Sequence, residues 1–124
     1  MENSTQLSSA ALAYLGDAVH ALYVRRHVME TGHTKSGALH AEGQKYVTAR
    51  AQAEAFCRIA PLLTEEETDV ARRAHNSSHL QRPKHMSVAD YRTATGLEAL
   101  LGMLYVNGRT ERLEELMAVI LKSE

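Results

Sequence analysis

The chain has 124 residues, 44% of them hydrophobic, which is the size of one domain around a single core. Its polar N-terminus lacks a signal-peptide pattern and no apolar run approaches about 20 residues, so we expect a cytoplasmic protein without a membrane partner. Its single cysteine, Cys57, excludes an internal disulfide and is expected to be a small buried hydrophobe. The net charge is −1, so any contact with a nucleic acid must depend on a local concentration of basic residues.

Helical patterns occupy the first half of the chain. The first predicted helix runs from about Ser8 to Glu30 and ends before Thr31-Gly32, where glycine supplies a chain reversal. A second predicted helix covers about Ser36 to Leu63, and Pro61 ends its regular part.

The second half contains two further start signals. Thr64-Glu-Glu-Glu67 is a capping box, which begins a helix that fades near residues 76–78. Ser87 begins a helix that runs to Asn107-Gly108, and a last amphipathic helix follows from Thr110, with an inner face of Leu113, Leu116, Met117 and Ile120. No segment alternates as a strand, so we predict an all-α, single-domain helical bundle over residues 1–124, with one long irregular piece at about 77–87.

An unusual acid, Asp17, lies within the first predicted helix. Leucine and valine at positions 12, 15, 19 and 22 form an apolar stripe that predicts the core face, and Asp17 points away from it. The residues beside Asp17 are small or apolar too: Ala10, Ala13, Tyr14, Ala21 and Val24. Either a second surface packs over this face and confines the carboxylate, or the helix is alanine-rich with one solvated acid.

A second unusual acid, Glu98, lies in a stretch whose apolar residues point in nearly every direction around the helix axis. Such a helix is buried on most sides, and a glutamate there needs an ion partner or a metal. One interpretation is a structural ion pair of either acid with an arginine, the candidates being Arg25, Arg26, Arg50 and Arg92. The other is that Asp17 and Glu98 together bind Mg²⁺, which takes one or two carboxylates and completes its shell with water and substrate phosphate.

Basic side chains concentrate between Val70 and Ala89, a stretch without an acid that holds Arg72, Arg73, Arg82 and Lys84. It is either a solvated face or an element that contacts phosphates, and the lack of interleaved aromatic residues favours a duplex over single strands. The seven histidines are interpreted as polar surface. His75 and His79 have the spacing of zinc ligands, but the helix is predicted to end between them.

Two motifs resemble the signatures of the ribonuclease III catalytic domain. AYLGDAVHALYV, residues 13–24, resembles the first signature, and LEALLGMLYVNG, residues 97–108, resembles the second, which carries an essential glutamate. The order of the motifs and the basic segment ahead of the second extend the resemblance over nearly the whole chain. The chain ends a short helix after the second motif, so it resembles the mini-ribonuclease III group of bacterial enzymes, which lack a double-stranded-RNA-binding domain.

This resemblance implies a Mg²⁺-dependent endoribonuclease that cleaves double-stranded RNA, leaving a 5′-phosphate and a 3′-hydroxyl, with Mn²⁺ able to replace Mg²⁺. Asp17 and Glu98 would be its catalytic, metal-binding residues, and the four basic residues above would contact RNA. Further acids of the long ribonucleases III correspond here to Ala10, Ala13 and Thr95, and the short group shares the last two replacements.

The same resemblance implies a two-fold homodimer that matures the large-subunit (23S) ribosomal RNA precursor, with a ribosomal protein as a further expected partner. Two other functions stay open. One is a catalytically silent ribonuclease III fold that serves as an RNA-binding or ribosome-associated module, although retention of Asp17 and Glu98 argues against it. The other is a helical dimer in which both acids are structural.

Overall fold

The structure is a computed structural model that describes residues 7–32, 34–77 and 86–122. These residues form six α-helices and a short 3-10 turn, and none of them lies in a strand, so the predicted all-α class is confirmed. The elements are α1 (Ser9–Glu30), α2 (Ser36–Val47), α3 (Ala49–Ile59), η2 (Ala60–Leu62), α4 (Glu65–Ser77), α5 (Val88–Val106) and α6 (Thr110–Ile120).

The predicted start and stop signals are confirmed at most helix ends. The Ser8 and Ser87 hydroxyls accept hydrogen bonds from backbone N–H groups in the first turns of α1 and α5. Thr31 caps the C-terminus of α1 and is followed by Gly32 with a φ of 99°, and Asn107 caps α5 and is followed by Gly108 with a φ of 69°. Glycine fits both places because a side chain disfavours positive φ.

The second predicted helix is two helices, so the prediction of one continuous helix is wrong. The chain is extended at Thr48, with φ −68° and ψ 155°, and α3 begins immediately afterwards. The Thr48 hydroxyl accepts a hydrogen bond from the backbone N–H of Ala51, which stabilises a new helix start within an otherwise helical pattern. The break lets α3 leave the direction of α2 and pack against α5.

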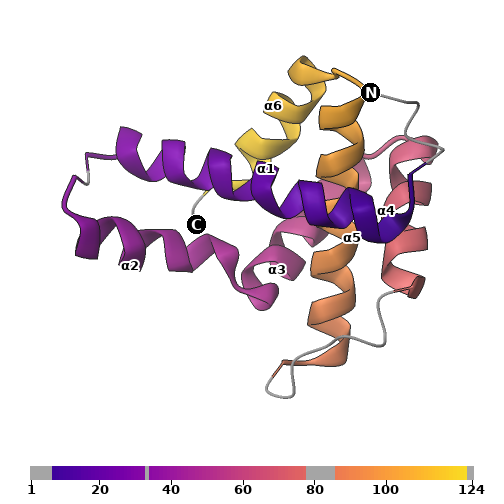
Figure 1. Ribbon diagram of the computed structural model, residues 1–124, viewed down its shortest axis with the longest axis horizontal. Coiled ribbons are helices and arrows are strands. Elements are labelled where there is room, and N and C mark those ends of the chain that lie inside the picture. The colour runs from indigo at the N-terminus through magenta and orange to yellow at the C-terminus, as the bar shows by residue number, and fades with distance from the viewer. Residues whose placement is uncertain (1–6, 33, 78–85, 123–124) are drawn as a thin grey trace.

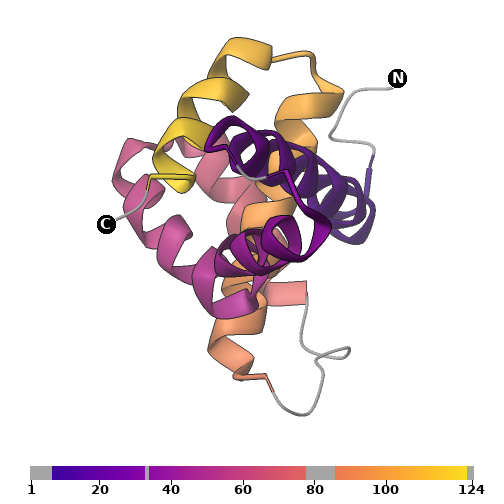
Figure 2. The same cartoon turned by 90° about the vertical axis from the view of Figure 1, so that its left-hand side faces the viewer.

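Helix α5 stands at the centre of the fold and is buried on most sides, as predicted. Figures 1 and 2 show α1 crossing it, with α3 and α4 lying on different sides of it. Helix α2 returns beside α1, and α6 folds back after α5 to pack against α3. Its inner face is the predicted one, with Leu113, Leu116, Met117 and Ile120 buried.

Helices α1 and α5 are in backbone contact where they cross. A Cβ atom built on Gly16 would lie 1.6 Å from the carbonyl oxygen of Glu98, and one built on Gly102 would lie 2.1 Å from that of Leu12. Neither position has room for a methyl group. The two glycines therefore set how closely the helices approach.

The contact with α5 selects a different face of α1 from the one predicted. Leu12 and Val19 are buried, but Leu15 is only half-buried and Leu22 is 65% exposed, so the predicted leucine stripe is only partly right. The buried face also includes small residues and a histidine, its members being Leu12, Ala13, Gly16, Val19, His20, Val24 and Val28. Close packing on α5 favours small residues here, and the larger Leu22 is left on the outside.

Cys57 on α3 is exposed, so the expectation that it is buried is wrong. Helix α3 turns another face inward and buries Gln52, Ala55 and Ile59 instead.

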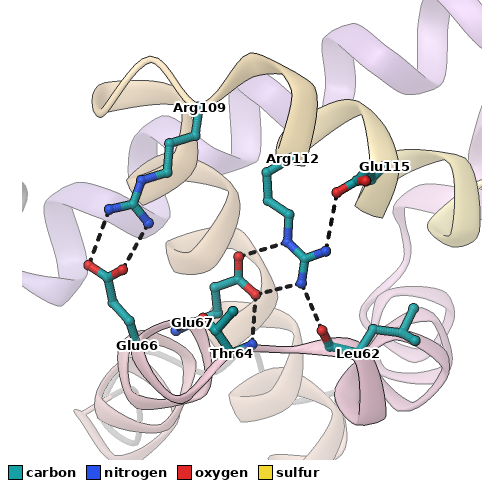
Figure 3. Close-up of polar contacts among 7 residues, drawn as sticks. All are labelled: Leu62, Thr64, Glu66, Glu67, Arg109, Arg112 and Glu115. Atoms are coloured by element: carbon teal, nitrogen blue, oxygen red, sulfur yellow. Dashed lines mark hydrogen bonds and ion pairs between the residues drawn. The ribbon is translucent and has the colours of Figure 1, made fainter.

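A polar cluster fastens α6 to the start of α4 (Figure 3). Arg112 donates two hydrogen bonds of 2.8 Å to the carboxylate of Glu67, which is 2% exposed, and a third of 2.7 Å to the carbonyl oxygen of Leu62. Glu67 also accepts from the Thr64 backbone N–H at 2.9 Å, which confirms the predicted capping box. These donors hold the pKa of Glu67 below its usual value.

The glycine crossing predicts the effect of a single methyl group. Gly16→Ala should lower the free energy of unfolding by about 3 kcal/mol, because backbone atoms of α5 would have to move. Gly37→Ala is the matched control in α2, since nothing lies within 4 Å of its built Cβ, and it should leave stability unchanged or raise it by up to about 1 kcal/mol. Urea denaturation measures both, and equal effects would show that the crossing tolerates a wider separation.

Candidate active site

The two unusual acids lie side by side at the crossing of α1 and α5. Gly16 packs on the backbone of Glu98, and Asp17 is the next residue along α1. Asp17 is exposed, Glu98 is partly buried, and their side chains are hydrogen bonded to each other. The face of Asp17 is therefore covered in part by α5 of the same chain, which leaves Asp17 at the open edge and Glu98 behind it.

The electrostatics of Glu98 reflect burial and a neighbouring acid. Burial raises its pKa to about 8, and the hydrogen bond and negative charge of Asp17 add to the rise, whereas a hydrogen bond with Gln52 opposes it. Two carboxyl groups so close cannot both ionise easily unless a cation joins them.

A structural ion pair does not account for Glu98. Among the described residues, no arginine or lysine contributes to the shift of its pKa. Of the proposed partners, Arg26 contacts Glu114 at 3.3 Å and Arg50 contacts Glu54 at 3.4 Å. The part of the chain that the structure describes therefore places an acid and an amide, but no basic side chain, against the Glu98 carboxyl group.

The donor set of Asp17 and Glu98 fits a hard divalent ion. Carboxylate oxygens are the ligands of Mg²⁺ and Mn²⁺, and Mg²⁺ commonly takes only one or two of them. Over residues 7–32, 34–77 and 86–122 no group of three His, Cys, Asp or Glu residues is arranged to hold a metal ion, so an ion bound by these two acids would need water and substrate phosphate to complete its shell. An open set of oxygen ligands is typical of catalytic Mg²⁺ sites and unlike a closed zinc site.

Two polar residues behind the acids were not predicted. His20 is 1% exposed, so its interpretation as polar surface is wrong, and Gln52 is 3% exposed. The Nε2 atom of Gln52 lies 3.3 Å from Nδ1 of His20. Position offered a signal: His20 follows Asp17 by three residues, on the side of α1 that carries Gly16 and Val24, and Gln52 shares a helix face with Ala55 and Ile59.

The predicted RNA-contacting residues are only partly within the described ranges. Arg72 and Arg73 lie exposed on α4, and both pair with Asp69, Arg73 at 3.1 Å. Arg82 and Lys84 lie outside the described residues. Ion pairs this exposed contribute little to stability, so both arginines could exchange Asp69 for a phosphate at small cost.

Residues 10–109 match the sequence model of the family described as Ribonuclease III domain. The chain belongs to the ribonuclease III family. Two similar curated proteins are both named Mini-ribonuclease 3. The one from Thermoanaerobacter sp. is 46% identical over 94% of this chain and 82% of its own length. The one from Symbiobacterium thermophilum is 41% identical over 94% of this chain and 90% of its own.

A crystal structure of a Fusobacterium nucleatum protein has the same fold. Its TM-score to this chain is 0.88 at 28% identity, with 99% of this chain and 100% of that chain covered. As a member of the ribonuclease III family, the protein is an endoribonuclease, and its family implies double-stranded RNA as the substrate. Enzymes of this family generally depend on a divalent metal ion. None of the described helices is long and apolar enough to cross a lipid bilayer.

Proposed function

We propose that Asp17 and Glu98 bind the divalent ion of this ribonuclease and that the ion is Mg²⁺, for which Mn²⁺ can substitute. The observation that carries this proposal is the contact of the two acids at the α1–α5 crossing, with no described cation acting on the buried one. Both residues fall within the part of the chain that matches the family. We also propose that residues 1–124 form one catalytic domain.

The two acids have different tasks in this proposal. Asp17, at the open edge, supplies a charged ligand where an RNA phosphate can approach. Glu98 is the second ligand, and the central helix α5 holds it in a fixed place. A bound cation would favour the ionised form of Glu98, with its proton passing to water, because the positive charge would compensate for the burial of the carboxylate. The bound ion would polarise the scissile phosphate and lower the pKa of the attacking water, so that no side-chain nucleophile is required.

Amide substitutions test the metal assignment. Asp17→Asn and Glu98→Gln should each abolish cleavage of labelled duplex RNA in Mg²⁺ and leave the circular dichroism spectrum unchanged, because amides keep the volume and lose the charge. Glu54→Gln, an exposed change on α3, is the matched control and should retain wild-type turnover. Near wild-type turnover of either site variant at saturating Mg²⁺ would refute the assignment.

Parallel reactions of the wild type with Ca²⁺ and with chelator separate RNA binding from RNA cleavage. If the wild type binds duplex RNA in Mg²⁺ but does not cleave it, the protein is a silent RNA-binding module.

A homodimer is the proposed assembly, and the outer face of α1 supports it. Tyr14, Leu22 and Met29 lie on one side of this helix and are 85%, 65% and 64% exposed. Large exposed apolar residues in a row are typical of an interface, and a second copy of the chain can cover them by two-fold symmetry. Such a dimer would present two copies of the Asp17–Glu98 site, one for each strand of a duplex.

Disruption of the α1 face should separate the proposed dimer. Leu22→Arg is expected to give a monomer in sedimentation velocity at micromolar concentration, since a charge replaces an apolar contact. Leu62→Arg is the matched control, because Leu62 is also half-exposed but lies in η2, and it should remain a dimer. A wild-type chain that sediments as a monomer while active would contradict the dimer itself.

We propose that Arg72, Arg73, Arg82 and Lys84 contact the RNA backbone, because Arg72 and Arg73 are exposed and their ion pairs with Asp69 are exposed too. The proposed substrate is the large-subunit (23S) ribosomal RNA precursor, with a ribosomal protein as an accessory partner in the cytoplasm. Resemblance to the short ribonucleases III supports these assignments, and a single cysteine suits a reducing compartment.

The salt dependence of RNA binding tests the basic residues. Changing all four to alanine should raise the apparent KM and flatten the slope of log affinity against log salt by up to about one unit per lost contact, because fewer counterions are released. Lys45→Ala with Lys122→Ala removes exposed charge elsewhere, and this control should leave the slope unchanged. If the quadruple variant kept the wild-type slope and affinity, the segment would be solvated surface only.

A further inference from the structure

A buried polar pair lies directly behind the candidate metal ligands. Among the described residues, the buried polar or charged side chains are His20, Gln52 and Glu67. Glu67 belongs to the cluster that fastens α6. The other two come from α1 and α3 and face each other, with Gln52 Nε2 at 3.3 Å from His20 Nδ1.

The chemistry of this contact fixes the proton on the imidazole. Burial lowers the pKa of His20 to about 4, so the ring is neutral near pH 7 and one of its nitrogens is an acceptor. With the amide nitrogen of Gln52 facing Nδ1, as the structure has it, that nitrogen donates and Nδ1 accepts, which leaves the ring hydrogen on Nε2. Within the described part of the chain, Nε2 has no hydrogen-bond partner.

The amide of Gln52 has a second hydrogen, and Glu98 is in reach of it. Gln52 hydrogen bonds to Glu98 and favours the charged form of that carboxyl, as a donor does. One amide nitrogen thus serves two acceptors, His20 and Glu98. An amide rotated by half a turn would present its oxygen to both, and that arrangement would suit a protonated Glu98 instead of a metal ligand.

We propose that His20 and Gln52 are positioning residues: His20 holds the amide of Gln52 with its N–H groups toward Glu98, and Gln52 thereby orients the Glu98 carboxylate to bind the divalent ion. This inference rests on the proposed function of Asp17 and Glu98. His20 acts only through Gln52.

Mn²⁺ binding to the RNA-free protein, followed by electron paramagnetic resonance of the free ion, tests the inference without cleavage. His20→Phe and Gln52→Leu should each weaken Mn²⁺ binding by roughly 10- to 100-fold, as loss of a group that orients a ligand does. His20→Asn places an amide oxygen near the position of Nδ1 and should restore binding to within about threefold of wild type. The double variant His20→Phe, Gln52→Leu should bind no more weakly than Gln52→Leu alone, because His20 acts through Gln52.

Thermal unfolding of the same variants separates positioning from a structural role. His20→Phe removes the ring N–H at Nε2, which has no described partner, and leaves the Gln52 N–H that faced Nδ1 without an acceptor. The two changes offset each other, so the melting temperature should change little while the Mn²⁺ affinity falls. Wild-type Mn²⁺ affinity in folded His20→Phe and Gln52→Leu would overturn the inference and leave the metal site intact. If Asp17→Asn and Glu98→Gln instead bind Mn²⁺ as tightly as the wild type does, the two acids are not the metal ligands. That result would overturn the proposed function, and the inference with it.

Nitrogen-15 NMR of the wild-type histidines tests the inference without any measurement of metal binding. The expected spectrum at neutral pH has His20 protonated at Nε2 and unprotonated at Nδ1, with His20→Asn used to assign the signals. A proton on Nδ1 would mean that Gln52 presents its oxygen to His20, and the inference would then be wrong.

Discussion

Helices α1 and α5 cross with backbone atoms in direct contact, because glycine occupies the facing position on each helix. Gly16 rests on the carbonyl of Glu98, and Gly102 rests on that of Leu12. This closeness has two results. It places α5 at the centre of the fold, and it brings the side chain of Asp17 next to that of Glu98, since each acid lies at or beside a contact residue. Larger residues at the glycine positions would separate the acids as well as the helices.

Glu67 and Glu98 lie in opposite surroundings. Glu67 accepts hydrogen bonds from Nε and Nη2 of Arg112, and its pKa lies below the usual value, so it is charged and satisfied without any added ion (Figure 3). Glu98 faces Asp17 instead, and its pKa is raised to about 8. The same residue type therefore fastens two helices in one place and lies beside a second acid in the other, and the difference in pKa follows from the charge of the neighbours.

Helix α1 divides its circumference between two kinds of contact. The side toward α5 carries glycine, alanine, valine and the buried His20, which permit a close crossing. The opposite side carries the exposed Tyr14, Leu22 and Met29, which suit the proposed contact with a second chain. With apolar residues on both sides, α1 has no single hydrophobic stripe, which explains why its core face could not be read from large residues alone.

Local sequence was sufficient for most of the secondary structure. Helix ends at Ser8, Thr64, Ser87 and Gly108 depend on hydrogen bonds or backbone angles within a few residues, so the sequence predicts them. The break at Thr48 was missed, because a threonine within a helical pattern becomes a cap only when the following helix has another helix to pack on.

The sequence also determined that Asp17 and Glu98 stand out, since each is an acid among residues unsuited to water, and it determined the family through the motifs around them. Only the tertiary structure decided that the two acids meet, that no described cation acts on Glu98, and that His20 and Gln52 lie buried behind them. The reason is physical: helical periodicity reports which residues share a face, whereas the fit of small residues between helices decides which face is covered and by what.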